Sequence, residues 1–201
     1  MNYYISDLHI GHANVTAEGT DFDGRSFKTL DEMHETIVKN WNNTITNADH
    51  IYILGDLAWK INDETISIVS RLRGNKHLIL GNHDSIKDSR YSRLFVEITE
   101  HKEVTDCIDQ EQYRVVMSHF PIMFWNKQHI LKSYGEERKC PAIHLYGHLH
   151  NGVEESYYQS LLQQVNTDLG RKGIAINVGC MLHDHTPKTL KQLMEGRNIH
   201  K

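Results

Sequence analysis

Five short groups of polar residues in this sequence contain side chains that can bind metal ions or transfer protons. They are Asp7-x-His9, Gly55-Asp56, Gly81-Asn82-His83-Asp84, Ser118-His119 and Gly147-His148-x-His150. Carboxylates, imidazoles and amide oxygens suit divalent transition metals, and the set contains no thiolate. A single group of this length usually marks a turn, so the meaning of the five depends on whether the fold brings them together.

Each group directly follows a short apolar run of the kind that forms a buried β-strand. The sequence predicts strands at residues 3–5, 51–54, 77–80, 115–117, 143–146 and 174–178. Ligands of open α/β sheets bind beyond the carboxyl ends of the strands, so the five groups are expected to converge on one crevice. Gly55, Gly81 and Gly147 suit such crowded loops, because a Cβ atom would obstruct close approaches there.

Helical patterns lie between several of these strands. Helices are expected at residues 30–45, 63–72 and 187–196. The first opens with a capping box formed by Thr29 and Glu32, and the third lies between Thr186 as N-cap and Gly196 as terminator. The alternation of strand and helix favours an α/β fold around a mostly parallel sheet, to which residues 97–118 add an antiparallel ribbon.

The composition indicates one soluble domain spanning residues 1–201. The sequence is 39% hydrophobic and 24% charged, near the averages for globular proteins, and is too short for two ordinary domains. Cys107, Cys140 and Cys180 are widely spaced, which argues against a disulfide framework or a cysteine-based zinc site. No apolar run approaches the roughly 20 residues that cross a bilayer, and no leader precedes the first strand, so we expect a cytoplasmic protein.

Charge and histidine content narrow the kinds of ligand. The formal net charge is -4 and no block of Lys and Arg runs along the chain, so a long nucleic acid is not the expected partner. The 15 histidines exceed what an ordinary surface needs. Histidine is both the commonest metal ligand and a frequent general acid, which agrees with a metal site that carries out acid–base chemistry.

In content and order, the five groups resemble the calcineurin-like metallophosphoesterase superfamily, whose pattern is DxH, GD, GNHD, a lone His and GHxH. The resemblance spans about residues 3–180 and is to small, single-domain members of bacterial or phage type. It implies a four-layer α/β/β/α sandwich without a large capping domain. It also implies a phosphatase or phosphodiesterase with two divalent transition metal ions, manganese first, with iron or zinc as alternatives.

The resemblance assigns roles to individual residues. It places Asp7, His9 and His150 on one metal, Asn82, His119 and His148 on the other, and Asp56 as the bridge between them. It also implies that a metal-bridging hydroxide attacks phosphorus. His83, which is not a ligand, would protonate the leaving oxygen or stabilise the charge that develops there. Asp84 is a candidate catalytic partner behind the site, or only caps a turn.

Other residues outside the five groups carry weaker expectations. Solvated side chains are expected for His34, His101, His129 and His200, structural roles in strands for His50, His77 and His144, and positions lining the pocket for His12, His183 or His185. Arg25 could bind a substrate phosphate or lie on a solvated loop. Relatives often have Ser where this chain has Cys180, which puts the local pocket chemistry in doubt.

The longest irregular stretch, residues 120–141, has two open interpretations. Its aromatic and basic residues are Phe124, Trp125, Lys127, Lys132, Tyr134, Arg138 and Lys139. Loops of this length in compact domains are usually functional or mobile, and a surface excursion packed by its own aromatics is equally consistent with the pattern.

Three functions remain open at this point. The expected one is hydrolysis of a small phosphorylated substrate, such as a nucleotide or a phosphodiester. A nuclease acting on short nucleic acids is an alternative, although the extra basic surface expected for a long strand is missing. A non-catalytic scaffold of the same fold is disfavoured because the ligand pattern and His83 are intact.

Overall fold

The computed structural model describes residues 1–130 and 140–197, which form two four-stranded sheets. The first sheet contains β1 (Asn2–Ile5), β2 (His50–Leu54), β3 (Asn75–Ile79) and β4 (Glu97–Thr99), paired in that order and all parallel. The second contains β5 (His101–Ile108), β6 (Glu111–Ser118), β7 (Ala142–Tyr146) and β8 (Ile174–Asn177). Only the β5–β6 pair is antiparallel.

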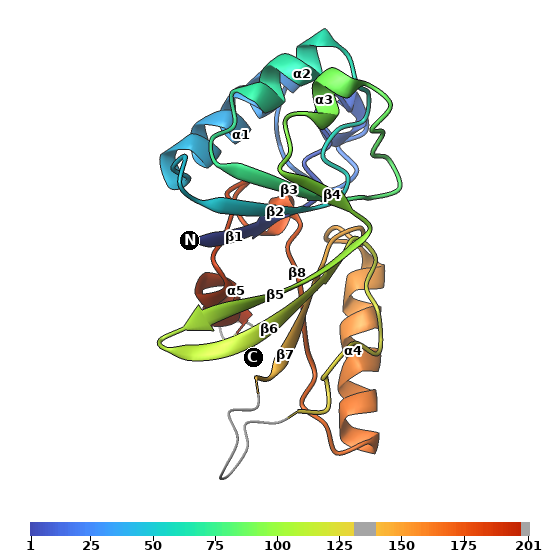
Figure 1. Cartoon of the computed structure of the whole chain (residues 1–201). Helices are drawn as coiled ribbons and strands as arrows, with labels where there is room; N and C mark the ends of the chain where they lie inside the picture. The colour runs from blue at the N-terminus through green and yellow to red at the C-terminus, as the bar shows by residue number, and fades with distance from the viewer. Residues whose placement is uncertain (131–139, 198–201) are drawn as a thin grey trace.

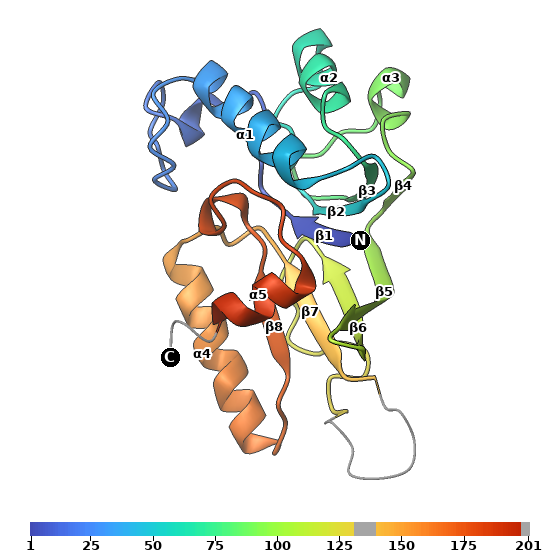
Figure 2. The ribbon, with the colours of Figure 1, turned by 90° about the vertical axis from the view of Figure 1, so that its left-hand side faces the viewer.

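Helices cover the outer faces of both sheets (Figures 1 and 2). Over the first sheet lie α1 (Leu30–Thr44), α2 (Asp63–Ser70) and α3 (Ser89–Ser92). The outer face of the second sheet carries α4 (Val153–Asp168), while α5 (Leu190–Arg197) contacts β1 and β5 at the side of the molecule. Two 3-10 turns, Ala13–Val15 and Cys180–Leu182, lie in the connections. The protein is therefore a four-layer α/β/β/α sandwich, as expected.

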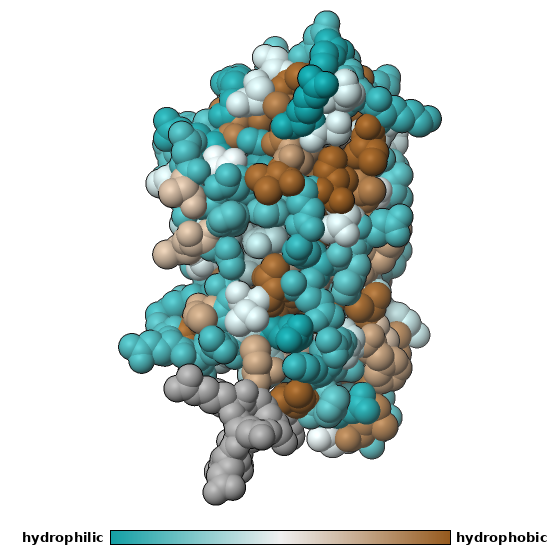
Figure 3. Space-filling model, viewed as in Figure 1, coloured by the Kyte–Doolittle hydropathy of each residue, from teal (hydrophilic) through white to brown (hydrophobic). Residues whose placement is uncertain are grey.

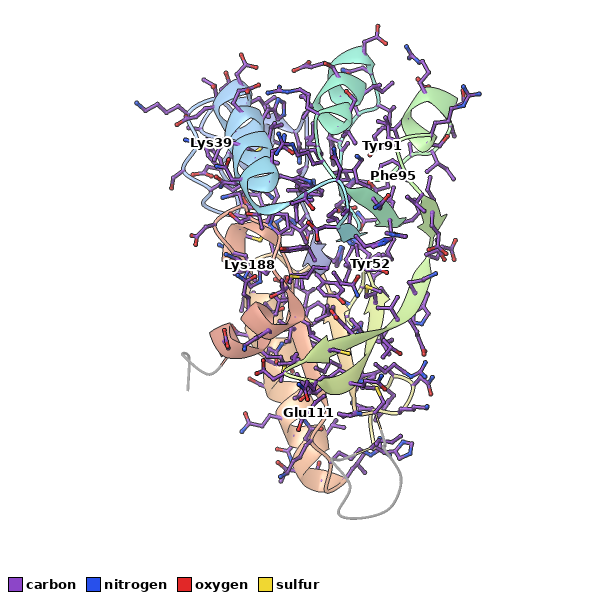
Figure 4. The ribbon with its side chains drawn as sticks, turned by 60° about the vertical axis from the view of Figure 1, so that its left-hand side comes forward. Lys39, Tyr52, Tyr91, Phe95, Glu111 and Lys188 are labelled. Atoms are coloured by element: carbon purple, nitrogen blue, oxygen red, sulfur yellow. The ribbon has the colours of Figure 1, made fainter. Side chains whose placement is uncertain are left out.

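The alternation of side chains along the strands explains the layers. In β2, Ile51 and Ile53 join the core under α1 and α2, whereas Tyr52 and Leu54 face the other way, into the core between the sheets. Figure 4 shows Tyr52 at this inner face, with Tyr91 and Phe95 on the helix side. A third core lies between the second sheet and α4. Three apolar cores thus hold four layers together.

The capping box predicted at the start of α1 is confirmed in a shifted form. The Thr29 hydroxyl accepts the main-chain N–H of Glu32, and the Glu32 carboxylate accepts the N–H of Lys28 rather than that of Thr29. Trp41 is completely buried and donates its indole N–H to the carbonyl of Arg73. The helix is therefore fixed both at its first turn and at its apolar face.

Three predictions about the elements were wrong in detail. Residues 97–99 pair with β3 in the first sheet, so the antiparallel ribbon begins only at His101. The last helix begins at Leu190, because Thr189 and Gln192 form its capping pair while Lys188 bonds to β1. Gly196 lies within that helix and does not end it. In addition, α4 was not predicted from the sequence.

No helix in residues 1–130 and 140–197 has the length and apolar character that crossing a bilayer requires. The face of the molecule in Figure 3 is mostly hydrophilic, and its apolar residues form separate patches.

His144 in β7 gives a pH-dependent contribution to stability. Its Nδ1–H donates to the carbonyl of Val116 and its Nε2 accepts the N–H of Ile122, so the buried ring is a neutral tautomer. Burial lowers its pKa from 6.5 to about 4. Between these values the unfolded chain binds the proton better, so stability should fall as the pH drops from 6.5 to 4, by on the order of 2–3 kcal/mol from this residue.

This contribution can be isolated with His144→Gln. Chemical unfolding of the chelator-treated protein between pH 7 and pH 4.5 should show a shallower loss of stability in the variant than in the wild type, although the variant starts from a lower value. Parallel losses in the two proteins would contradict a neutral buried His144.

Candidate metal centre

The five polar groups meet at the carboxyl ends of strands from both sheets. Two clusters can each hold a metal ion, since the potential ligand atoms within a cluster lie within 4.8 Å of one another. The clusters are Asp7, His9 and His150, and Asp56, His119 and His148. The Asn82 side-chain oxygen is 3.0 Å from His119 Nε2, which puts it beside the second cluster.

Asp56 lies between the two clusters. Its Oδ2 is 3.5 Å from His119 Nε2 in its own cluster and 3.8 Å from His9 Nε2 in the other. Its Oδ1 accepts the main-chain N–H of His83 at 3.0 Å, which fixes the orientation of the carboxylate. This is the position that a carboxylate shared by two ions would need.

The backbone at the site is held in an unfavourable conformation. Positive φ angles occur at Asp7, His9, Asp56, His148 and His150, with values from 50° to 70°. Non-glycine residues rarely adopt this left-handed region, and strain of this kind gathers at functional sites. The main-chain hydrogen bonds from Asp7 and His9 to Gly55 and Asp56 help to hold the first two loops in place.

Glycine is required where these loops touch. A Cβ on Gly147 would lie 2.5 Å from Asp7 Oδ2, and one on Gly81 would collide with Asp56 Oδ1. The carboxylates of both clusters therefore pack directly against the main chain of a neighbouring loop, as the expected close approaches required.

The histidine tautomers suit a metal site. His119 Nδ1 donates to the carbonyl of Leu54 at 2.8 Å, and His150 Nδ1 donates to Asp23 Oδ2 at 2.7 Å. In each neutral ring the Nε2 lone pair then points into the site, where His119 Nε2 faces the oxygen of Asn82 and His150 Nε2 lies 3.2 Å from His9 Nε2. Electron pairs this close need a proton or a cation between them, so the residues fit metal ions.

The electrostatics also favour cations. Burial raises the pKa of Asp7, which is completely enclosed. Burial alone would lower the pKa of His119. The nearby carboxylates of Asp56 and Asp7 outweigh this effect and raise its pKa, which shows that a positive charge is favoured at this position. Burial would raise the pKa of Asp56 as well, but hydrogen bonding and the charge of His119 lower it to about 2.

His83 lies beside the clusters with its side chain 37% exposed. Its Nε2 is 3.9 Å from Asp56 Oδ2, and its ring centroid is 4.5 Å from that of Trp59 and 5.8 Å from that of His9. The ring therefore borders the site while remaining open to solvent, where an incoming substrate can reach it.

Asp84 does not face the open side of the site. Its Oδ2 accepts the main-chain N–H groups of Asp56 and Gly81, and its Oδ1 accepts that of Leu57. Burial is the main reason that its pKa is raised. Asp84 thus ties the loop of Asp56 to the loop of Gly81, which makes it a positioning residue. It caps the turn of its own loop, as one of the two expectations had it, and also the loop that carries Asp56.

Asp23 lies behind the site and was not predicted from the sequence. Besides accepting from His150, its carboxylate forms a bidentate pair with the buried guanidinium of Arg25. Hydrogen bonding to His150 and Arg25 outweighs burial and lowers the Asp23 pKa to about 2. A carboxylate behind a histidine fixes the orientation and tautomer of the ring, so Asp23 holds His150 ready to bind metal.

Arg25 fits neither of its two expected roles. Its guanidinium is buried, pairs with Asp23 and donates to the carbonyls of Asp7 and Leu8 at 2.8 and 3.0 Å. It is therefore neither solvated nor free for a phosphate, and it supports the main chain of the first loop. Cys180 is also buried and donates to the Asp7 carbonyl, so its side chain is not part of the pocket surface.

The remaining histidines divide into buried and exposed groups. The prediction for His34 was wrong, because its buried Nε2 accepts the N–H of Gly11. His101 and His129 are exposed as expected, and His50 and His77 bond to each other in neighbouring strands. His200 lies outside the described residues.

Only one of the three candidate pocket histidines borders the site. His12 stacks on Trp59 with ring centroids 3.9 Å apart and lies 5.4 Å from the ring of His9. His183 instead donates to the Asn177 carbonyl at 3.0 Å, and His185 packs edge-on against Phe27.

The long irregular stretch is described only in part. Trp125 is buried in the core under α4 and donates to the Ala142 carbonyl, whereas Phe124 is exposed. Lys132, Tyr134, Arg138 and Lys139 lie outside the described residues, so their expected roles stay predictions.

Comparisons with known proteins agree with this geometry. The chain is 38% identical over 84 residues to an uncharacterized protein of Methanocaldococcus jannaschii, a match that covers 41% of this chain and 46% of that protein's length. It is also 28% identical over 167 residues to the Gene 66 protein of Mycobacterium phage D29, covering 77% of this chain and 80% of the phage protein. The Gene 66 protein of phage L5 is 26% identical over 164 residues, covering 74% and 77%.

A solved structure of a protein of unknown function from Aquifex aeolicus shares the fold, with a TM-score of 0.57, 22% identity, and coverage of 97% of this chain and 98% of that one. The family model for calcineurin-like phosphoesterases matches residues 3–152, a span that contains all five polar groups. The chain therefore belongs to the calcineurin-like phosphoesterase family.

Proposed function

We propose that this protein hydrolyses phosphoesters with two divalent metal ions. The observation that carries the proposal is the pair of ligand clusters with Asp56 between them and the exposed ring of His83 alongside. One ion would be held by Asp7, His9 and His150, the other by Asn82, His119 and His148, and Asp56 would serve both. Family membership supports the same chemistry.

Each group would have a separate task. Bound ions would supply positive charge to the phosphoryl oxygens and would activate a water molecule near neutral pH. The Nε2 of His83 would donate a proton to the leaving oxygen as its bond to phosphorus breaks. Asp23 and Asp84 would act only through other residues, by holding His150 and the loops of Asp56 and Gly81.

All seven expected ligand side chains lie in or beside the two clusters, which disfavours a non-catalytic scaffold. A scaffold has no need for strained backbone at five ligand positions or for a solvent-exposed histidine beside them. This backbone strain lowers the free energy of unfolding. It is expected at a catalytic site, whereas a scaffold that only binds partners has no use for it.

Metal removal tests the proposal. Exhaustive chelation should abolish hydrolysis. We expect Mn²⁺, the first ion implied by the family resemblance, to restore it best. Fe²⁺ and Zn²⁺ are alternatives, because carboxylates, imidazoles and an amide oxygen can bind all three ions. The assay should compare aryl phosphate monoesters, aryl diesters, nucleotides and cyclic nucleotides, alongside elemental analysis.

A matched control comes from a third acidic cluster, formed by Asp31, His34 and Glu64. His34 uses Nε2 to accept the N–H of Gly11, and Glu64 is exposed, so this cluster is not expected to bind metal. Glu64→Gln should therefore keep the metal content and activity of the wild type. Full hydrolysis by verified metal-free protein would refute the proposal.

A further inference from the structure

An aromatic wall, formed by Phe22, His12 and Trp59, runs along one side of the metal centre. His12 lies in the middle, stacked on Trp59 at 3.9 Å with an interplanar angle of 5°, and its centroid is 6.1 Å from that of Phe22. The two ends of the wall touch the site, since Phe22 is 5.2 Å from the ring of His150 and Trp59 is 4.5 Å from that of His83.

The two end rings of the wall face solvent, whereas His12 between them is only partly exposed. Phe22 is 52% exposed and Trp59 is 37% exposed. Phe120, 48% exposed, borders the second ligand cluster, 4.5 Å from the ring of His148. Among the described residues one other Phe or Trp ring is exposed, that of Phe124, and its centroid lies 5.9 Å from the guanidinium carbon of Arg171. Exposed Phe and Trp rings are thus concentrated around the metal centre.

The main chain holds Trp59 in place. Its N–H donates to the Ile10 carbonyl at 2.9 Å, and the preceding residue, Ala58, forms a bridge with Ile10. The ring is therefore presented by a segment tied to the loop that carries Asp7 and His9. A platform held in this way loses little conformational entropy when a ligand stacks on it.

A pocket of about 320 Å³ opens beside the Phe22 end of the wall. It is lined by Phe22, His148, Leu149, His150, Asn151 and Glu154, among others. Its volume is at the small end of the range for ligand sites, and it combines apolar faces with amide and carboxylate groups that can bond to N–H and O–H donors. The carboxylate of Glu154 disfavours an additional phosphate there and favours a neutral group that carries donors.

From these observations we infer that the aromatic wall binds the planar base of a nucleoside phosphate whose phosphoryl group lies at the metal centre. Stacking on aromatic faces suits any nucleobase, and Glu154 can accept from amino or hydroxyl groups. The net charge of -4 favours a mononucleotide or a short ester over a long strand. The inference rests on the proposed function for the position of the phosphate, but it makes its own claim about binding.

Tryptophan fluorescence tests binding without reference to hydrolysis. Trp41 and Trp125 are buried, so Trp59 is the indole that a ligand at the wall can reach. With Mn²⁺ bound, adenosine 5′-monophosphate should quench the emission and should bind on the order of tenfold more tightly than ribose 5-phosphate, which lacks the base and is measured as a competitor. In chelator the phosphate loses its partner ions, so the quenching should require a higher nucleotide concentration. Trp59→Phe should remove the quenching and keep most of the affinity, whereas Trp59→Leu should lose the preference for the base.

Phe124→Leu is the matched control, because it removes an exposed ring that contacts Arg171 instead of the metal centre, and it should keep the tenfold preference. In steady-state assays, Trp59→Leu should raise the KM for nucleotides about tenfold and leave the KM for ribose 5-phosphate unchanged. Equal affinity of the wild type for the two ligands would overturn the inference. Base-dependent binding without hydrolysis of any ester would uphold the wall and refute the proposed function instead.

Discussion

The Asp56→Asn variant is expected to lose both metal ions, whereas His9→Ala should lose mainly one. Asp56 Oδ2 lies within 4 Å of a histidine Nε2 from each cluster. An amide cannot offset the repulsion between two divalent ions as a carboxylate does. We expect the metal content of Asp56→Asn to fall well below that of His9→Ala, together with all activity.

Asparagine is the suitable replacement because it keeps the local backbone. Residue 56 has a φ of 51°, a conformation that Asn tolerates better than most residues, and the Asn oxygen can still accept the N–H of His83. Circular dichroism should therefore be unchanged, and elemental analysis after gel filtration gives the result. Two ions per chain in Asp56→Asn would contradict the proposal that Asp56 is a ligand of both ions.

The strands that carry the site were predictable because burial on both faces leaves continuous apolar runs. Residues 51–54 and 143–146 read as strands, and both are fully buried in the structure. A polar group that follows such a run lies at the carboxyl end of the strand. Because the carboxyl ends of parallel strands meet at one edge of a sheet, the five groups could be predicted to converge. No local sequence pattern indicates that the strands divide into two sheets. This part of the fold was predicted only from the family resemblance.

The helix α4 was missed because its apolar face is diluted by polar residues. Tyr157, Tyr158, Leu161 and Leu162 lie on one side of the helix, but Glu154, Gln164 and Asp168 fall on the same side, and only Tyr158 and Leu162 are buried. The N-cap residue, Gly152, provides no side-chain cap. Its position is set by packing against β7 and β8, which the chain assembles from distant segments.

Asp23 was missed for a different reason. Its partner His150 is 127 residues away, so nothing near Asp23 in the sequence indicates the contact. Arg25 and Cys180 likewise act through the Asp7 carbonyl from behind the site. Residues that bind metal follow a local pattern, whereas those that orient the ligands depend on tertiary contacts.

The His83→Ala variant is expected to keep both metals and the fold but to lose roughly 10²- to 10⁴-fold in turnover, the usual contribution of a general acid. The imidazole contributes no ligand atom to either cluster, and its main-chain N–H, which holds Asp56, remains in the variant. Elemental analysis and steady-state kinetics should be measured on the same preparation. Loss of an ion would mean that His83 is a ligand.

The choice of substrate decides whether His83 acts as a proton donor. An alkoxide leaves poorly unless it is protonated in the transition state, whereas nitrophenolate leaves largely unaided. The His83→Ala defect should therefore be much larger for an alkyl ester than for a nitrophenyl ester. If the ring instead stabilises charge on the phosphoryl oxygens, both substrates should slow by similar factors, because that charge is present with either leaving group. Equal defects would thus exclude the proton-donor role and leave the metal ligands as assigned.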